Sequence, residues 1–286
     1  MNKRTLINKL CAYGRLMRLD KPVGILLLLW PTLWGLLLAG QGQPNWQIVL
    51  IFVTGVILMR SAGCVMNDIA DRDFDGYVER TQNRPLVTGE VSVKEALLLA
   101  AGLSLAAFSL VCFLNKLTIQ LSIVALFLAA TYPLTKRFLR IPQAYLGITF
   151  GLSIPMAFAA LTNQIPPLAW ALLLANVFWV IAYDTEYAMV DREDDVKIGI
   201  QSSALFFGRY EVPTIMACYT AMVAIFIYIG KIMAFGACYF AGIFVVLGLI
   251  IRQYEMIKAR QKKRCFNAFL ANNWIGLTLF VSILLG

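Results

Sequence analysis

The sequence contains nine runs of mostly apolar residues, and these runs restrict its fold more than any other feature. They lie near residues 22–40, 47–66, 96–114, 117–135, 142–161, 168–186, 212–230, 233–251 and 267–285. A helix of about 20 such residues crosses the hydrocarbon core of a bilayer. Charged residues make up only 14% of the 286 residues, whereas soluble domains contain about 25%. The sequence therefore predicts an all-α membrane protein, with nine transmembrane helices in a single domain over residues 1–286.

The basic residues predict how these helices are oriented. Lys and Arg gather in the N-terminal arm (1–21), in the loop at 136–140 and in the run at 252–264, whereas the connections on the other side contain only Lys116 and Lys231. Because Lys and Arg favour the cytoplasmic side, we expect a cytoplasmic N-terminus and, after nine spans, a C-terminus on the far side. The arm has no Ser-rich transit peptide and no cleavage site follows the first span, which favours a bacterial inner membrane with a periplasmic C-terminus.

The charge and the missing residue types exclude several functions. The chain has a net charge of +9, which is expected when its cytoplasmic face meets anionic lipid headgroups. The sequence contains no basic stripe with interleaved aromatic residues that would suggest a nucleic-acid partner. The chain has no histidine, which excludes histidine acid–base chemistry and the usual zinc sites. Six cysteines show no metal-ligand spacing, and we expect each to be a small buried apolar residue: Cys11, Cys64, Cys112, Cys218, Cys238 and Cys265.

The acidic residues are concentrated in two stretches on the predicted cytoplasmic side. Fourteen of the 16 Asp and Glu residues lie at 68–95 and 184–211, seven in each stretch. If the preceding helices continue a few turns beyond their apolar parts, side chains spaced four residues apart share one helix face. These are Asn67, Asp71 and Asp75, with Asp68 beside them, and then Asp184, Tyr187, Asp191 and Asp195.

The repeated spacing predicts a shared cation. Like charges four residues apart on a helix repel each other, so a helix that keeps them needs positive charge nearby. Magnesium usually bridges one or two carboxylates to the phosphates of a substrate. The alternative is a solvated cap in which the acids pair with neighbouring bases, but it does not explain why two clusters have the same spacing. Those bases are Arg72, Arg80, Arg84, Arg192 and Lys197.

Two segments resemble the signature motifs of the UbiA family of intramembrane prenyltransferases. NDIADRDFDGYVERTQNRPLVTG fits the family pattern NDxxDxxxD, and DREDDVKIGIQSSALFFG contains its DxxxD pattern from Asp191 to Asp195. A YxxxK element matches Tyr132 to Lys136. The flanking stretches RLDKPVGILLLLWPTLWGL and SIPMAFAA are most similar to the branch that acts on 4-hydroxybenzoate in ubiquinone biosynthesis.

The resemblance implies a fold and a reaction. Family members have nine helices around a central cavity that opens to lipid, and the acidic motifs cap it on the cytoplasmic side. We therefore expect Mg²⁺-dependent transfer of a polyprenyl group from polyprenyl diphosphate to C3 of 4-hydroxybenzoate, with release of diphosphate. Homogentisate, a naphthoate, haem or a phospholipid precursor are alternative acceptors. A membrane carrier is disfavoured, because carriers bind at the midplane whereas these acids lie at one surface.

The motifs also predict the roles of individual residues. Magnesium is expected on Asn67, Asp68, Asp71, Asp75, Asp191 and Asp195. The catalytic carboxylates among them are Asp71, Asp75, Asp191 and Asp195. The diphosphate is expected on Arg72, Lys136, Arg137 and Lys197, since basic side chains suit phosphate oxygens. Aromatic residues near the motifs are candidates for shielding or positioning an allylic cation: Tyr132, Tyr183 and Tyr187.

Arg60 is the basic residue that lies inside a predicted span, and an intramembrane arginine usually marks a function or a partner. It precedes Asn67 by seven residues, so it lies on the same helix face and about 10 Å deeper. We expect it to pair with the carboxylate of 4-hydroxybenzoate. The alternatives are that Arg60 extends toward the cytoplasmic boundary or pairs with Asp68.

The predicted orientation can be tested by thiol labelling. In a variant without its own cysteines, Gly42→Cys should react with a membrane-impermeant reagent added from the periplasm, because the loop at 41–46 is uncharged. Gly76→Cys should not react, because the loop at 72–94 contains four basic residues. The opposite labelling pattern would overturn the inside–outside assignment.

Overall fold

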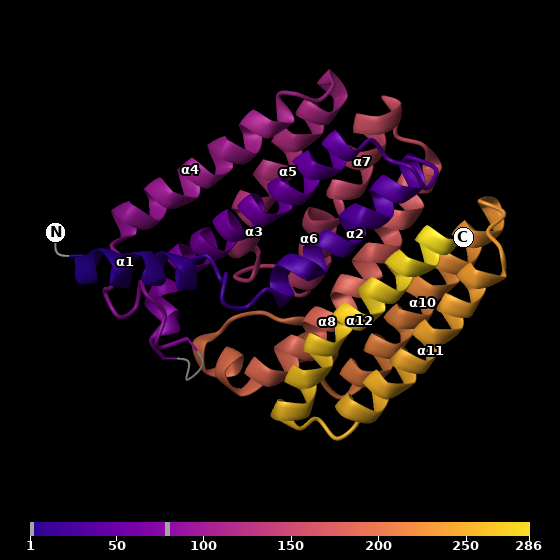
Figure 1. Cartoon of the computed structure of the whole chain (residues 1–286). Coiled ribbons are helices and arrows are strands. Elements are labelled where there is room, and N and C mark those ends of the chain that lie inside the picture. Colours follow the sequence, from indigo (N-terminus) through magenta and orange to yellow (C-terminus); the bar gives the residue numbers. More distant parts are fainter. Residues whose placement is uncertain (1–2, 78–80) are drawn as a thin grey trace.

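The computed structural model describes residues 3–77 and 81–286, and this part of the chain forms helices joined by short connections (Figure 1). The α-helices and one short 3₁₀-helix are α1 (Lys3–Leu16), α2 (Val23–Ala39), α3 (Trp46–Asp75), α4 (Val93–Val111), α5 (Lys116–Thr135), α6 (Pro142–Gly151), α7 (Ser153–Thr162), α8 (Pro167–Ile198), α9 (Ser203–Phe207), η1 (Gly208–Tyr210), α10 (Glu211–Ile232), α11 (Ala237–Ile257) and α12 (Lys262–Leu285). The all-α prediction is confirmed.

The helices account for the predicted membrane spans. Within the described residues, eight helical segments are long and apolar enough to cross a bilayer, and α6 and α7 together form one of them. The apolar helix α2, with 17 residues, corresponds to the remaining predicted span. The protein is therefore a multi-pass membrane protein. Figure 1 places its N and C termini at opposite ends of the bundle.

The span predicted at 142–161 is interrupted at Leu152, where α6 ends and α7 begins. Pro155 explains the break, because proline lacks an N–H and its ring clashes with the carbonyl four residues earlier. An irregular backbone at membrane depth needs partners from neighbouring helices. Asn176 of α8 donates a hydrogen bond to the Gly147 carbonyl at 3.0 Å, and the hydroxyls of Thr32 and Ser153 lie 2.8 Å apart.

Helices α3 and α8 are longer than a membrane requires. They contain 30 and 32 residues, so each is roughly 45 to 48 Å long against a hydrocarbon core of about 30 Å. The prediction that both helices continue past their apolar parts into the acidic motifs is therefore confirmed. Helix α8 ends at Gly199, whose φ of 72° is the left-handed conformation that suits a glycine C-cap.

The N-terminal arm, which carries no predicted span, forms the helix α1 instead of an extended segment. Ala12 and Leu16 are buried in a cluster with Val65 of α3 and with the start of α4. Lys9 pairs with Glu95, which also completes a capping box at the first turn of α4. This packing fixes α1 beside the acid-bearing part of α3.

Aromatic side chains fill the contact between α2, α8, α10 and α12. Trp34 and Trp179 lie 5.1 Å apart between ring centroids, and Phe226 meets Trp34 edge-on at 5.2 Å. Gly276 lies against the rings of Trp30 and Trp179, where any side chain would collide with them. This close packing makes α8 the central helix of that half of the bundle, as Figure 1 illustrates.

The cysteines divide into two groups. Cys64, Cys218 and Cys265 are buried, as predicted, whereas Cys11, Cys112 and Cys238 are exposed. The prediction was wrong for the second group, since Cys112 and Cys238 lie at outward-facing positions at or near the ends of membrane helices and Cys11 lies on the exposed side of α1.

Candidate active site

A cavity of about 1150 Å³ lies inside the bundle and joins two different environments. At one end its lining contains the polar residues of both acidic motifs. Its remaining wall is mostly apolar and includes Phe52, Val56 and Leu114. Phe108 of α4 and Ile123 of α5 line the cavity and are both exposed. We infer that the cavity opens sideways between these helices, toward lipid.

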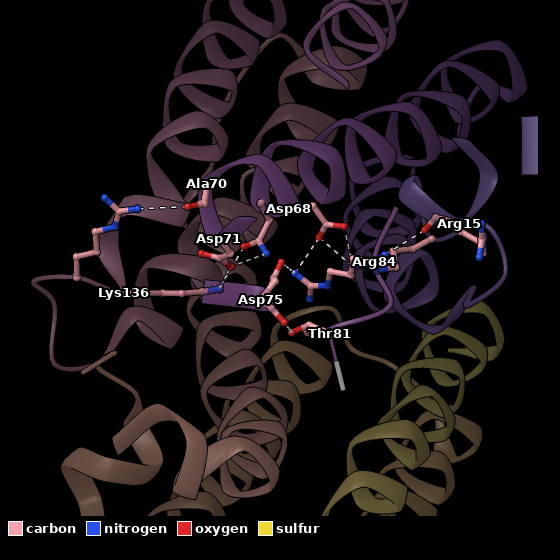
Figure 2. Close-up of polar contacts among 11 residues, drawn as sticks. Arg15, Asp68, Ala70, Asp71, Asp75, Thr81, Arg84 and Lys136 are labelled. Atoms are coloured by element: carbon pink, nitrogen blue, oxygen red, sulfur yellow. Dashed lines mark hydrogen bonds and ion pairs between the residues drawn. The ribbon is translucent and has the colours of Figure 1, made fainter. Parts of the chain in front are cut away.

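The first motif forms a network that includes the end of α5. Asn67 donates to Asp71 at 2.9 Å, as the spacing of four residues on one helix face predicts. Lys136 approaches both, at 3.2 Å from Oδ1 of Asn67 and 3.3 Å from Oδ2 of Asp71 (Figure 2). The ammonium group offsets the charge of Asp71 at the mouth of the polar end.

Asp68 and Asp75 are held by arginines from two other segments. Arg84 forms ion pairs with both carboxylates, and Arg18 donates to both oxygens of Asp68 at 2.9 and 3.0 Å. Thr81 donates to the backbone carbonyl of Asp75 at 2.7 Å. Figure 2 shows Arg84 between the two carboxylates. Burial raises the pKa of the Asp75 carboxyl, and the positive charge of Arg84 opposes this effect.

The second motif lies on the cavity side of α8. Asp184, Tyr187, Asp191 and Asp195 all line the same cavity as the first motif, so the face predicted from their spacing exists. Arg192 points elsewhere and pairs with the buried Glu211 at 3.2 Å. The Arg192–Glu211 pair anchors the end of α8 to the start of α10. Arg260, in the connection between α11 and α12, also binds Glu211, at 2.7 Å.

The two motifs do not form a ready-made metal site by themselves. Among the residues that the structure describes, no group of three His, Cys, Asp or Glu side chains is arranged to hold a metal ion. Oxygen donors from α3 and α8 nevertheless line one cavity. Such a donor set suits a hard divalent cation that takes its other ligands from a bound anion.

Not every basic residue predicted to bind diphosphate lines the cavity. Lys136 does, whereas Arg72, Arg137 and Lys197 are absent from its described lining. Arg72 pairs with Asp73, Lys197 pairs with Asp194, and Arg137 donates to the Ala70 carbonyl at 3.3 Å. Their assignment to the diphosphate stays a prediction. Arg80, one of the bases considered for a solvated cap, lies outside the described residues.

Arg60 lines the cavity below the first motif. Its Nε donates to the carbonyl of Gly24 at 3.2 Å, and its guanidinium carbon lies 5.6 Å from the centre of the Phe150 ring. The alternative pairing with Asp68 is not what the structure contains, because Arg18 and Arg84 hold that carboxylate. Arg60 thus adds a positive charge to the cavity wall at membrane depth.

Several cavity residues were not predicted as site residues from the sequence. Tyr132, Tyr183 and Tyr187 line the cavity as expected. Asp184 also lines it, although its spacing along the sequence placed it only on the same helix face and predicted no role for it. The hydroxyl of Tyr183 is buried and has no hydrogen-bond partner within the described structure. Arg18 was missed as a partner of the acids, whereas Arg84 was considered as one only in the alternative of a solvated cap. The position of Arg84 within the first motif was the available signal, whereas nothing in the sequence connects Arg18 to Asp68.

Fold and site together define a class: a membrane protein whose apolar, laterally open cavity ends in a polar pocket, suited to an amphipathic anion. The model of the UbiA prenyltransferase family matches residues 28–282, and the chain belongs to this family. It is 61% identical over 284 residues to a 4-hydroxybenzoate octaprenyltransferase of Methylobacillus flagellatus, covering 99% of this chain and 96% of the relative. A protein of the same name from Nitrosospira multiformis is 60% identical over 281 residues, covering 98% and 97%.

Solved structures of the family have the same fold. A UbiA homologue from Aeropyrum pernix superimposes with a TM-score of 0.80 at 26% identity, over 90% of this chain and 96% of the other. A UbiA homologue from Archaeoglobus fulgidus, whose structure holds GPP and Mg²⁺, gives a TM-score of 0.69 at 21% identity, over 95% and 99%.

The ion pairs of the first motif predict a difference in stability between two arginine variants. Arg84→Gln should destabilise the purified protein by about 3 kcal/mol, because it leaves two buried carboxylates without their shared cation. Arg72→Gln is the matched control and should cost about 1 kcal/mol or less, since Arg72 and Asp73 are exposed. Thermal unfolding in detergent without substrates measures both. Equal shifts in the two variants would contradict the role given to Arg84.

Proposed function

We propose that this protein transfers a polyprenyl group from polyprenyl diphosphate to C3 of 4-hydroxybenzoate and releases diphosphate, a step of ubiquinone biosynthesis. One observation carries the proposal: an apolar, laterally open cavity ends at two acidic motifs, in a chain about 60% identical to 4-hydroxybenzoate octaprenyltransferases over nearly its whole length. A long isoprenoid needs an apolar space that it can enter from lipid. Its diphosphate needs counter-charge at the polar end. We treat residues 1–286 as one domain with this activity.

The metal is best held by motif side chains from α3 and α8 that offer oxygen donors to the same cavity. Asn67, Asp71, Asp191 and Asp195 offer hard oxygen donors to one cavity, and Asp75 joins them if it releases Arg84. A magnesium ion bound there would supply Lewis-acid neutralisation of the leaving diphosphate. The homologue from Archaeoglobus fulgidus that binds GPP and Mg²⁺ supports this choice of cation.

Asp68 has a different role from the other motif acids. It was predicted from the sequence as a metal ligand, but both of its oxygens accept hydrogen bonds from Arg18, and it also pairs with Arg84. We propose that Asp68 orients Arg84 toward the polar end of the cavity, which Arg84 lines. Lys136 and Arg84 are then the basic groups best placed for the phosphate oxygens.

The cavity also provides what the carbon centre needs. Breaking the carbon–oxygen bond leaves an allylic cation that water would consume, so an apolar wall protects it. Tyr132, Tyr183 and Tyr187 line this region, and aromatic faces stabilise cations by about 0.5–2 kcal/mol each. Arg60 pairs with the acceptor carboxylate and presents C3 to the cation, which then forms the new carbon–carbon bond as the ring loses its proton.

We further propose a bacterial inner membrane with the acidic motifs and N-terminus in the cytoplasm and the C-terminus in the periplasm. The basic loops on one side support this orientation. Homogentisate and a naphthoate are the alternative acceptors for the same site, and the identity to the 4-hydroxybenzoate enzymes favours 4-hydroxybenzoate over them.

The metal role predicts a sharp loss of activity in two variants. Membranes that contain the chain should convert radiolabelled 4-hydroxybenzoate to lipid-soluble product with a prenyl diphosphate and magnesium, lose this activity with EDTA, and regain it with added magnesium. Asp71→Asn and Asp191→Asn should lower turnover by about 100-fold or more, because an amide does not replace the charge on the metal. Asp73→Asn, on an exposed side chain of the same helix, is the control. Normal turnover of either motif variant at saturating magnesium would refute the site.

Arg60 predicts a selective effect on the acceptor. Arg60→Ala should raise the KM for 4-hydroxybenzoate by about 10-fold or more, the value of a lost charge-assisted hydrogen bond, and leave the KM for the prenyl diphosphate nearly unchanged. Arg60→Lys should recover part of the loss, because it restores the charge without the planar fork. Steady-state kinetics with each substrate varied in turn measures this. Equal changes in both KM values would remove Arg60 from the acceptor site.

A further inference from the structure

Glu186 is a buried acid for which the proposed reaction has no use. Its side chain is 0% exposed and does not line the cavity. Each residue turns an α-helix by about 100°, so Glu186 lies roughly opposite Asp191 and Asp195 on α8. The helix therefore presents motif acids on one side and this acid on the other, toward α10 and α12.

Three side chains from three helices surround Glu186. Oε2 accepts a hydrogen bond from the Asn272 amide of α12 at 2.8 Å, and Oε1 lies 3.0 Å from the hydroxyl of Tyr219 on α10. The same hydroxyl lies 2.8 Å from Oδ1 of Asn272. Trp179, about two turns before Glu186 on α8, donates its indole N–H to that Oδ1 at 2.9 Å.

The number of available hydrogens restricts the state of Glu186. The indole of Trp179 only donates, so it fixes Oδ1 of Asn272 as the acceptor and Nδ2 as the group that faces Glu186. The Tyr219 hydroxyl has one hydrogen and lies within hydrogen-bond distance of two acceptor oxygens, Oδ1 of Asn272 at 2.8 Å and Oε1 of Glu186 at 3.0 Å. If Glu186 is ionised, one of these two contacts has no hydrogen between its oxygens. If Oε1 of Glu186 carries a proton, that proton is donated to the Tyr219 oxygen, the Tyr219 hydroxyl donates to Asn272, and both contacts are hydrogen bonds.

The charge around Glu186 agrees with this count. Within the described part of the chain, no lysine or arginine forms an ion pair with it, and the nearby arginines Arg192 and Arg260 are bound to Glu211. An ionised carboxylate without a counter-charge is costly in a membrane interior, whereas a neutral acid that both donates and accepts is fully satisfied there.

We propose that Glu186 is a protonated carboxylic acid and a positioning residue: together with Tyr219, Asn272 and Trp179 it fixes the rotation of α8, so that Asp191 and Asp195 face the cavity. The cluster joins α8 to α10 and α12 at the back of the motif face. The effect on metal and diphosphate rests on the proposed function, whereas the protonation of Glu186 does not.

Infrared spectroscopy tests the protonation without any assay of activity. The difference spectrum between wild type and Glu186→Gln, in lipid at neutral pH, should show the loss of the carbonyl stretch of a protonated carboxylic acid. Glu193→Gln is the matched control: this acid lies on the same helix, is exposed and pairs with Lys262, so its spectrum should lose carboxylate bands instead. Loss of carboxylate bands in Glu186→Gln would overturn the proposal.

Kinetics and stability test the positioning role. Glu186→Gln keeps one donor and one acceptor, so its thermal midpoint and activity should match those of the wild type. Glu186→Leu should raise the magnesium concentration for half-maximal activity by about 10-fold, because a change in the rotation of α8 displaces Asp191 and Asp195, and loss of the support of metal ligands costs about 10-fold or more in metal affinity. Its KM for 4-hydroxybenzoate should not change, because Arg60 lies on α3.

Tyr219→Phe keeps the ring, removes the linking hydroxyl and should raise the magnesium requirement in the same way. It tests the positioning role even if Glu186→Leu does not fold. An unchanged magnesium requirement in Tyr219→Phe, or a loss of activity in Glu186→Gln, would refute the positioning role. Wild-type protein without prenyl transfer would refute the proposed function instead, and the infrared result would still stand.

Discussion

The mutual repulsion of the carboxylates at the ends of α3 and α8 is the constraint on which the rest of the polar structure depends. A membrane protein cannot leave such charges buried and unpaired. Three separate segments supply positive charge to the first motif: the connection between α1 and α2 through Arg18, the loop after α3 through Arg84, and the end of α5 through Lys136. Each of these ion pairs also ties its own segment to the site, so the same interactions shape the polar end of the cavity.

The two motifs differ in how they are balanced. The first has Asp68 and Asp75 engaged by arginine, while Asp71 contacts Lys136. In the second, the arginine within the motif points away from the cavity and binds Glu211. The first motif thus contributes both acids and bases to the pocket, whereas the second contributes mainly acids. An anion that arrives with its own divalent cation matches this division, since the cation favours the acids and the phosphate oxygens favour the bases.

Helix α8 links the polar chemistry to the packing of the bundle. Its back is held by aromatic stacking around Trp179 and by the buried contacts of Glu186, and its end is held by Glu211. Rigid support of this kind matters because a reacting group displaced by about 1 Å can cost a large factor in rate. The apolar half of the cavity needs less rigid side-chain positions, because a prenyl chain binds there through the hydrophobic effect, which has no preferred direction.

The sequence by itself determined the helical membrane fold, the approximate spans, the extension of α3 and α8 into the acidic motifs, and the grouping of Asp71, Asp75, Asp191 and Asp195. Hydrophobic length and the 3.6-residue period are local properties, and they survive in any fold that contains the helices. Only the tertiary structure decided which charges meet. Arg18 reaches Asp68 across 50 residues, Arg84 pairs with both Asp68 and Asp75, and Glu186 turns to a partner 86 residues away. These pairings depend on how helices pack side by side, and no spacing along one helix encodes that arrangement.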